Sequence, residues 1–263
     1  MTDINPSSGR VLAVANQKGG VGKTTTAINL ATSLALDNQR VLLVDIDPQS
    51  NLTSGVGLKG KQTEAGTVYE ALMTGAPPES FILPTQVANL SAIPANRNLT
   101  GAEIELVNMP NREYRLRRVL EPLRGQFDLI FIDCPPSLGL LTLNALVAAD
   151  AVVIPLHCEY FALEGLADLI GTMRRVRTTL NPNIDIEGVL LTMYDERTNL
   201  GQLVARDVRE FFRAKVFNTI IPRNVRLGEA PSHGMPAVLY DAKSRGAAAY
   251  AALAKEMLAR SPA

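Results

Sequence analysis

The sequence predicts an α/β fold in which one domain is built on a mostly parallel, twisted sheet with helices on both faces. Short apolar runs rich in β-branched residues alternate with longer segments of helical periodicity, which is typical of βαβ crossovers. The chain has 263 residues, 46% of them hydrophobic, which suffices to bury one substantial core. No internal repeat or linker marks a domain boundary, so we expect residues 10–260 to form one domain after a flexible N-terminus of residues 1–9.

The spacing of the apolar residues predicts where the individual strands and helices lie. Strands are expected at residues 11–15, 41–44, 129–132, 151–155 and 186–192. Helices are expected at residues 23–36, 111–123, 138–148, 163–180, 200–212 and 246–259. Glycine, proline and polar residues at 55–66 and 75–84 interrupt the pattern, so the region between the second strand and Leu129 is expected to be an irregular insertion, a kind of segment that often carries function.

Composition restricts the class of protein. Lysine plus arginine (26) equals aspartate plus glutamate (26), so any surface for nucleic acid has to be a local patch. The two cysteines, Cys134 and Cys158, lie in apolar stretches and indicate neither a disulfide scaffold nor a zinc framework. The first ten residues lack the apolar core of a signal peptide, and no apolar run reaches the ~18 residues of a membrane span. We therefore expect a cytoplasmic protein that does not enter the membrane.

A phosphate-binding loop is predicted where the first strand meets the first helix. The segment from Asn16 to Thr25 reads Asn-Gln-Lys-Gly-Gly-Val-Gly-Lys-Thr-Thr. Glycines let successive backbone N–H groups converge on phosphate oxygens, and the helix N-terminus adds a partial positive charge. Lys23 is expected to reach the β- and γ-phosphates, and the Thr24 hydroxyl to bind Mg²⁺. The alternative, a glycine-rich turn without a ligand, requires a chance match in this context, so the fold is predicted to be that of a P-loop NTPase.

The loop departs from the usual P-loop pattern at one position. Gln17 stands where the pattern has glycine, and a second lysine, Lys18, follows it. Phosphate binding within one subunit does not need this lysine. Its ammonium could instead cross an interface and meet the phosphates of a facing nucleotide, as an arginine finger does.

Carboxylates follow two of the predicted strands. Asp133 comes after the strand at 129–132, and Asp45 and Asp47 end the strand at 41–44. Ligands of open α/β sheets bind beyond the carboxyl ends of the strands, so these carboxylates are expected beside the phosphate loop. Asp133 is predicted to hold Mg²⁺ through water, the alternative being a helix N-cap. Asp45 and Asp47 alternate along the chain and share one side; either could serve the metal or the attacking water, or one could cap the following turn.

With Lys18-Gly19-Gly20-x-Gly22-Lys23-Thr24, the sequence resembles the deviant Walker A family, which includes ParA, MinD and the nitrogenase iron protein. The resemblance extends from Arg10 to about Leu258, and residues 159–166, 191–195 and 221–226 look like chromosomal ParA proteins, also called Soj. It implies ATP hydrolysis in a sandwich dimer around two ATP molecules, with Lys18 acting in trans on the facing nucleotide. It also implies that Asp47 orients the attacking water and that Asp45 supports the hydrated metal.

The same resemblance supplies the remaining nucleotide contacts. Pro222 and Asn224 are implied to flank the adenine, with Met193 and Asp195 nearby, while the segment from Glu159 is implied to line the dimer interface. The phosphate-loop residues implied to contact ATP are Lys18, Gly19, Gly20, Val21, Gly22, Lys23, Thr24 and Thr25.

ParA proteins bind DNA without sequence preference as ATP dimers and release it on hydrolysis, stimulated by a ParB partner bound near the replication origin. The resemblance thus implies a homodimer, double-stranded DNA and a ParB-type centromere-binding protein as partners, and a nucleoid-associated location. A local excess of positive charge between residues 197 and 226 supports this, because it could pair with DNA phosphates. The candidate DNA contacts are Arg197, Arg206, Arg209, Arg213, Arg223 and Arg226. Arg206, Arg209 and Arg213 recur at helical spacing and are expected on one face, which could also be an ordinary solvated surface.

Three other classes of protein need features that this sequence lacks or does not reveal. A MinD-like, membrane-associated positioning ATPase needs a strongly amphipathic C-terminal helix, for which residues 253–263 are a poor match. An iron–sulfur protein needs a second cysteine at the proper spacing from Cys134, and a metabolic enzyme needs an acceptor pocket that the sequence does not reveal. His157 and His233 are interpreted as structural.

Overall fold

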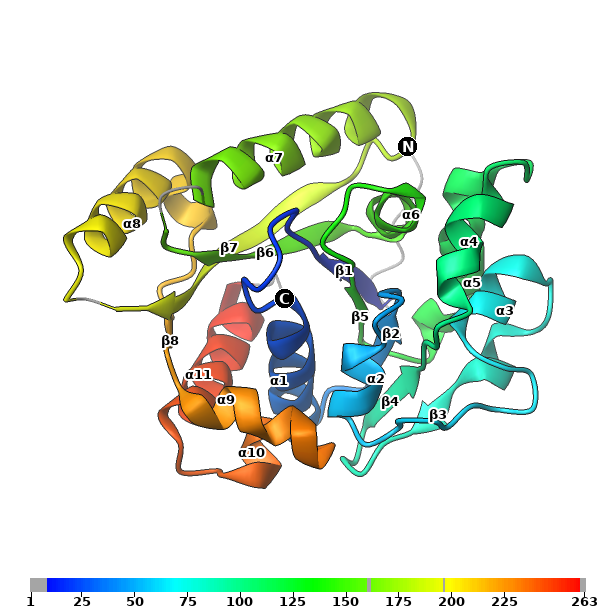
Figure 1. Ribbon diagram of the computed structural model, residues 1–263, viewed down its shortest axis with the longest axis horizontal. Helices are drawn as coiled ribbons and strands as arrows, with labels where there is room; N and C mark the ends of the chain where they lie inside the picture. Colours follow the sequence, from blue (N-terminus) through cyan, green and yellow to red (C-terminus); the bar gives the residue numbers. More distant parts are fainter. Residues whose placement is uncertain (1–8, 160–161, 196, 261–263) are drawn as a thin grey trace.

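An eight-stranded sheet runs through the computed structural model, which describes residues 9–159, 162–195 and 197–260 (Figure 1). The strand order is β3-β4-β2-β5-β1-β6-β7-β8, and neighbouring strands run parallel except β3 and β4. The strands are β1 (Arg10–Val14), β2 (Val41–Asp45), β3 (Leu83–Pro84), β4 (Leu90–Ile93), β5 (Leu129–Asp133), β6 (Ala151–His157), β7 (Asp185–Tyr194) and β8 (Ile221–Pro222). The predicted α/β class with a mostly parallel sheet is confirmed.

Side-chain alternation explains why helices cover both faces of this sheet. Along β1, Val11 and Ala13 enter one buried cluster while Leu12 and Val14 enter the other. Because successive side chains of a strand point to opposite faces, an apolar run without alternation must be covered on both sides. Two hydrophobic cores result, one on each face of the sheet.

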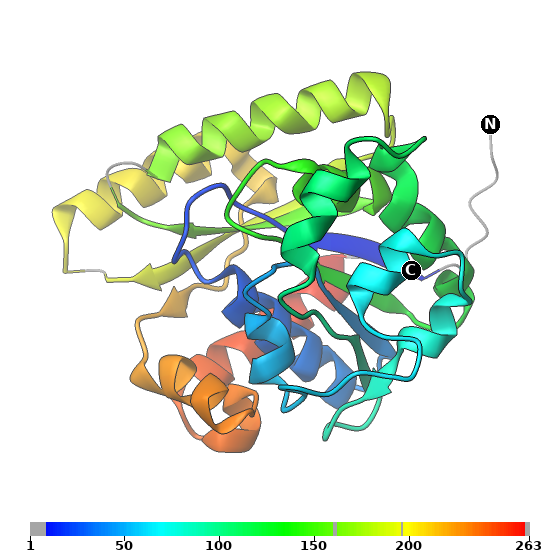
Figure 2. The same ribbon diagram turned by 45° about the vertical axis from the view of Figure 1, so that its right-hand side comes forward.

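The helices divide between these two cores (Figures 1 and 2). One face carries α1 (Lys23–Leu36), α2 (Asn51–Gly55), α9 (Val225–Glu229), α10 (Ala237–Tyr240) and α11 (Arg245–Arg260). The other carries α3 (Val68–Met73), α4 (Leu99–Leu106), α5 (Arg115–Leu120), α6 (Leu140–Ala148), α7 (Ala162–Thr179) and α8 (Asn199–Phe212). Short 3₁₀ turns occupy Pro78–Phe81, Arg112–Tyr114, Glu121–Gly125, Arg213–Lys215 and Ala230–His233. No helix in the described ranges is long and apolar enough to cross a membrane.

The region after β2 is not an irregular insertion, and that prediction is wrong. Strand β4 lies next to β2 in parallel register, from Val41 opposite Leu90 to Val44 opposite Ile93, so this region extends the central sheet. Its strands are short, four residues in β4 and two in β3. Strands of this length are too short for a hydrophobic periodicity to be recognised in the sequence. The predicted continuous helix at 111–123 is also wrong. Only α5 is α-helical there, and Pro122, which lacks a backbone N–H, lies in the 3₁₀ turn that follows.

The N-terminal segment expected to be flexible, residues 1–9, lies outside the described residues apart from Gly9. The Gly9 N–H donates to the Arg124 carbonyl at 2.8 Å. The chain is therefore fixed to the body of the protein from Gly9 onward.

Candidate active site

The loop between β1 and α1 ends at the N-terminus of α1, as the sequence predicts. Gly20 (φ 72°) and Gly22 (φ 88°) adopt positive φ, which side chains with a Cβ rarely do, so these two positions need glycine. Gly22 is the N-cap of α1 and no side chain caps the helix. The N–H groups of the first turn are therefore available to an anionic ligand.

The two lysines of the loop have different surroundings. Lys23 is 7% exposed, and its Nζ donates to the Lys18 carbonyl at 3.1 Å. Burial lowers the pKa of Lys23, while the charges of Asp133 and Asp47 act in the opposite direction. The Lys18 side chain is 31% exposed, and its ammonium pairs with Glu159 Oε2 at 2.8 Å. Lys23 thus lies inside the site, and Lys18 lies at its solvent-facing rim.

Asp133 is a fully buried carboxylate, and neither of its oxygens has a hydrogen-bond donor of normal geometry among the described atoms. Burial and the charge of Asp45 raise the pKa of Asp133 well above its usual range, and the nearby Thr24 hydroxyl opposes this. A buried carboxylate without donors is costly unless a cation satisfies it. The described residues contain no group of three or more histidine, cysteine or acidic side chains that could hold a metal. Mg²⁺ is usually bound by one or two protein oxygens together with phosphates and water, and the Asp133 carboxylate and the adjacent Thr24 hydroxyl could supply such oxygens.

Asp45 and Asp47, predicted to share one side, have separate environments. Asp45 is completely buried; Oδ2 accepts from the Thr53 N–H (2.9 Å) and hydroxyl (2.6 Å), and Oδ1 from the Asp47 N–H (3.1 Å). Burial raises the pKa of Asp45 to about 6. Asp47 lies on the cavity wall and accepts from the Gln49 N–H at 2.9 Å. Asp45 therefore holds the backbone after β2, and Asp47 faces the space where a ligand would bind.

A cavity of about 740 Å³ opens beside the loop and brings together most of the predicted nucleotide contacts. Met193, Pro222 and Asn224 line it together with Lys23 and Asp47. The phosphate-loop residues on its wall are Gly19, Gly20, Gly22, Lys23, Thr24 and Thr25. Val21, which is 1% exposed, lies behind the loop.

Asp195 does not line this cavity. It borders the neighbouring hollow, where its carboxylate binds Arg197 through Nε (2.9 Å) and Nη2 (2.7 Å). The Arg197 hydrogen bonds lower the pKa of Asp195 below the usual range of an aspartate. Asp195 therefore orders Arg197, and its place near an adenine stays a prediction.

Three residues that sequence reasoning did not select hold the phosphate loop and the first turn of α1. The Asn16 side chain donates to the Pro155 carbonyl (2.8 Å) and accepts from the Lys18 N–H (3.0 Å). Thr192 donates its hydroxyl to the Val21 carbonyl at 2.8 Å. Tyr250 shares a hydrogen bond of 3.0 Å with the Thr26 hydroxyl. An asparagine directly before a turn is a signal the sequence does carry, but Thr192 and Tyr250 reach the loop from distant elements and leave no local pattern.

The basic residues do not form one helical stripe. Arg206 and Arg209 lie on α8, but α8 ends at Phe212, and Arg213 begins a 3₁₀ turn with φ 49°. The prediction that Arg213 shares their face by helical spacing is wrong for this reason. Arg226 lies on α9 and is paired with Glu229 at 2.7 Å and with Asp241 at 3.3 Å.

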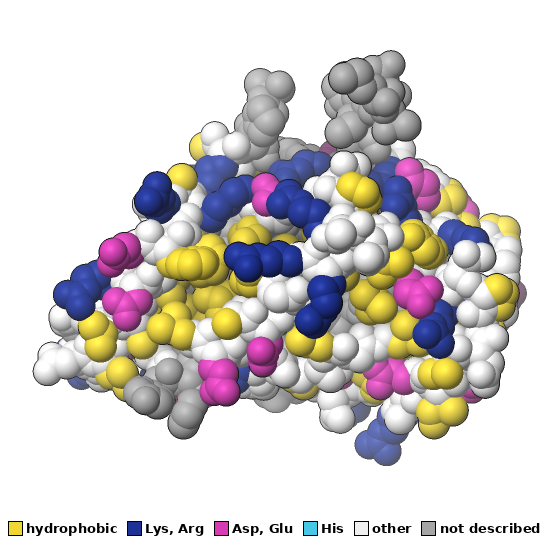
Figure 3. Space-filling model, turned by 90° about the horizontal axis from the view of Figure 1, so that it is seen from above, with side chains coloured by type: hydrophobic (Ala, Val, Ile, Leu, Met, Phe, Trp, Pro, Cys, Tyr) yellow, Lys and Arg dark blue, Asp and Glu magenta, His cyan; other side chains and the backbone are white. Residues whose placement is uncertain are grey.

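Beyond the carboxyl ends of β7 and β8, the structure gathers a different basic group. Arg197, Arg223 and Arg245 line one hollow of about 1010 Å³ next to the nucleotide cavity, and Arg245 was missed in the sequence because it belongs to α11. Figure 3 shows further lysine and arginine side chains on the face that carries α7 and α8, around a strip of hydrophobic side chains. Arg174, Arg175 and Arg177 of α7 add to the arginines of α8 on this side. Positive charge thus adjoins the nucleotide cavity through tertiary structure.

The histidines and cysteines carry no catalytic arrangement in the described residues. Cys134 and Cys158 are free and buried, and burial raises the pKa of both thiols. His157 Nδ1 lies 3.1 Å from Glu159 Oε1.

Comparison with known proteins relates the whole chain to partitioning ATPases. A family model described as an AAA domain matches residues 9–186. The chain is 56% identical over 252 residues to the chromosome partitioning protein ParA of Myxococcus xanthus, covering 96% of this chain and 89% of the relative. It is 57% identical over 251 residues to the sporulation initiation inhibitor protein Soj of Bacillus subtilis, covering 95% and 99%.

Solved structures share the fold along nearly the full length. A Mycobacterium smegmatis protein described as cobyrinic acid a,c-diamide synthase, with bound ADP and magnesium, is 40% identical with a TM-score of 0.82, covering 95% of this chain and 94% of that one. The cell division ATPase MinD of Pyrococcus furiosus is 27% identical with a TM-score of 0.78, covering 96% and 100%.

Proposed function

Because this chain belongs to the ParA/Soj family of chromosome-partitioning ATPases, we propose that it is a nucleotide-driven DNA-partitioning switch. Residues 10–260 would form its ATPase domain. In this proposal two copies enclose two ATP molecules and bind duplex DNA without sequence preference. ATP hydrolysis, stimulated by a ParB-type centromere-binding protein, then releases the DNA and so segregates chromosome origins or plasmids.

The observation that supports ATP chemistry most strongly is the buried Asp133 carboxylate, which has no hydrogen bond of normal geometry among the described atoms and lies beside the hydroxyl of Thr24 in the first turn of α1. Thr24 and Asp133 are proposed to hold Mg²⁺, and Asp45, which also fixes the adjoining backbone, is proposed to support the hydrated metal. Mg²⁺, when bound, would neutralise charge on the phosphates. The residues proposed to contact ATP are Lys18, Gly19, Gly20, Val21, Gly22, Lys23, Thr24, Thr25, Met193, Pro222 and Asn224.

Three side chains are assigned to hydrolysis. Lys23, already inside the cavity, binds the β- and γ-phosphates and stabilises the charge that develops on them. Asp47 faces the cavity and orients the attacking water. Lys18 exchanges Glu159 for the phosphates of the facing nucleotide, so that hydrolysis requires the dimer.

DNA binding is assigned to the basic residues beyond β7 and β8 and on α8. Arg197, Arg206, Arg209 and Arg223 carry this assignment, while Arg213 and Arg226 stay as outlying candidates. A monomer with so few phosphate contacts binds weakly, and a dimer doubles the contacts. ATP-dependent dimerisation would therefore raise DNA affinity and place the protein on the nucleoid.

The test is binding to a duplex of arbitrary sequence with ADP, with ATP, and with ATP on Lys18→Ala, across a salt series. Lys59→Ala, which removes an exposed lysine outside the site, is the matched control. We expect salt-sensitive binding with ATP alone, retained in Lys59→Ala and lost in Lys18→Ala. ATP hydrolysis without DNA binding would contradict the proposal; vesicle binding under those conditions would then favour a MinD-like positioning ATPase.

A further inference from the structure

Thr192, at the end of β7, lies against the phosphate-binding loop. Its hydroxyl donates to the Val21 carbonyl at 2.8 Å, and a Cβ added at Gly22 would stand 4.0 Å from its methyl group. Thr192 is 2% exposed and Val21 is 1% exposed, so water does not compete for this hydrogen bond. One buried side chain thus joins the phosphate loop to the strand that leads into the basic surface.

The next residue has an unusual backbone. Met193 adopts φ 48°, and the pairing of β7 with β8 shifts register between Thr192 and Tyr194. A residue other than glycine holds a positive φ only where its surroundings enforce it, and such positions concentrate at binding sites and switches. The contacts on either side of Met193 therefore determine the conformation of the segment that follows.

That segment is tied to the basic surface. The Asp195 carboxylate accepts from the Arg197 N–H at 3.0 Å as well as from its guanidinium. The Asp195 carbonyl accepts from the Thr198 hydroxyl at 3.0 Å, and Thr198 caps α8 by accepting from the Gly201 N–H at 3.3 Å. A continuous set of hydrogen bonds thus runs from this segment to Arg197 and to the N-terminus of α8.

We propose that Thr192 is a positioning residue that transmits the state of the phosphate loop to Met193, Asp195 and Arg197. When a nucleotide orders the loop, the Val21 carbonyl is fixed, and the Thr192 hydroxyl fixes the backbone at Met193 with it. The coupling itself needs only a nucleotide in the cavity. The consequence of this coupling for DNA binding rests on the proposed function, in which Arg197 contacts DNA.

The test compares Thr192→Val, which keeps the shape but removes the hydroxyl, with Thr192→Ser, which keeps the hydroxyl. Thr32→Val is the matched control, because Thr32 is fully buried in α1 and its hydroxyl has no hydrogen-bond partner in the described part of the chain. Hydrogen exchange of the backbone amides is measured with and without saturating Mg·ADP. Slower exchange at residues 19–25 shows in each variant that the nucleotide is bound.

We expect the nucleotide to slow exchange at residues 197 and 198, which do not line the nucleotide cavity and whose N–H groups donate to Asp195, by about tenfold or more in the wild type, Thr192→Ser and Thr32→Val, and by less than about twofold in Thr192→Val. A full response in Thr192→Val, a lost response in Thr192→Ser, or no response in the wild type would each overturn the proposal. DNA binding with ATP and with ADP is measured on the same samples. If the exchange result is as expected but the wild type binds DNA equally with ATP and with ADP, the proposed function fails and the coupling stands. If the wild type binds DNA only with ATP but the exchange result is not as expected, the coupling alone is wrong.

Discussion

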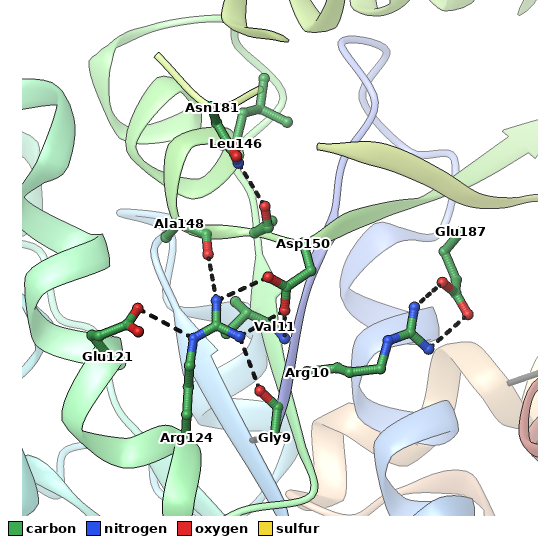
Figure 4. A network of polar contacts seen from close by, with 11 residues as sticks. Gly9, Arg10, Val11, Glu121, Arg124, Leu146, Ala148, Asp150, Asn181 and Glu187 are labelled. Atoms are coloured by element: carbon green, nitrogen blue, oxygen red, sulfur yellow. Dashed lines mark hydrogen bonds and ion pairs between the residues drawn. The ribbon is translucent and has the colours of Figure 1, made fainter. Parts of the chain in front are cut away.

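The charged side chains at the two ends of the parallel sheet have opposite surroundings. At the amino end, the Arg124 guanidinium donates to the Gly9 carbonyl (3.0 Å) and to both oxygens of Asp150 (2.7 and 3.0 Å), and Asp150 also accepts from the Val11 N–H (Figure 4). At the carboxyl end, the oxygens of the fully buried Asp133 have no hydrogen bond of normal geometry within the described atoms, although the Thr24 hydroxyl lies nearby. The amino end satisfies its charges internally and stabilises the fold, whereas the carboxyl end leaves a charge for a ligand to satisfy.

The most severe loss of activity is expected from Asp133→Asn at the carboxyl end. ATP turnover should fall by at least about a hundredfold, because electrostatic stabilisation at the phosphates is lost. The free energy of unfolding of the nucleotide-free protein should stay unchanged or rise by about 1 kcal/mol, because a buried charge without a donor is removed. Turnover with Mg·ATP and urea unfolding measure the two effects. If Asp133→Asn markedly destabilises the nucleotide-free protein, Asp133 has an internal partner, and the two ends of the sheet do not differ in the way described.

The amino end should respond in the opposite sense. Arg124→Met is expected to lower the free energy of unfolding by about 2 kcal/mol, below the usual cost of breaking a fully buried pair because the Asp150 side chain is 40% exposed. Nucleotide affinity should not change. Urea unfolding and an ATP titration check this, with Arg40→Ala as the control, because the Arg40–Asp128 pair is solvent-exposed and its loss should have a smaller effect. Equal losses in the two variants would contradict a special role for the amino-end network.

A smaller effect is expected for the arginines at the carboxyl end. Replacing Arg209 and Arg223 together by alanine should weaken duplex DNA binding by about tenfold at low salt and reduce the slope of log affinity against log salt by about 2. Arg226→Ala and Arg197→Ala should each change the slope less, because Glu229 and Asp241 already pair with Arg226 and Asp195 pairs with Arg197. Fluorescence anisotropy across a salt series measures both. An unchanged slope in the double variant would place the DNA surface elsewhere.

The smallest effect is expected from Tyr250→Phe, which tests an internal hydrogen bond at the carboxyl end of the sheet. Tyr250→Phe removes the partner of the buried Thr26 hydroxyl and should lower the free energy of unfolding by about 1 kcal/mol. Tyr250 also lines the nucleotide cavity, so ATP affinity should fall by less than about tenfold. Thermal unfolding and an ATP titration give the two values. A loss of ATP affinity of about a hundredfold or more would assign Tyr250 a direct role in nucleotide binding.

Local patterns account for what the sequence predicted well. Helix α1 begins at Lys23 and ends at Leu36, as expected, because the glycine loop and the apolar period mark both ends within one segment. Asp133 ends β5 for the same reason. These features depend on residues close together in the chain.

Tertiary structure determines the features that were missed. Thr192 meets Val21 across 171 positions, and Tyr250 meets Thr26 across 224, so no period or spacing joins them. The environments of Asp45 and Asp47 differ because Thr53, in a separate helix, binds only Asp45. Such contacts become visible only when the sheet order is known.

The two outermost strands of the sheet, β3 and β8, bear on how copies of this chain behave when crowded. Each is two residues long and contains a proline, Pro84 or Pro222, which offers no N–H to an approaching strand. A neighbouring molecule therefore finds few backbone groups to pair with on these two strands themselves. Many copies held close together should stay soluble as separate globules instead of joining into continuous sheets, and any association is confined to side-chain surfaces that can be taken apart again.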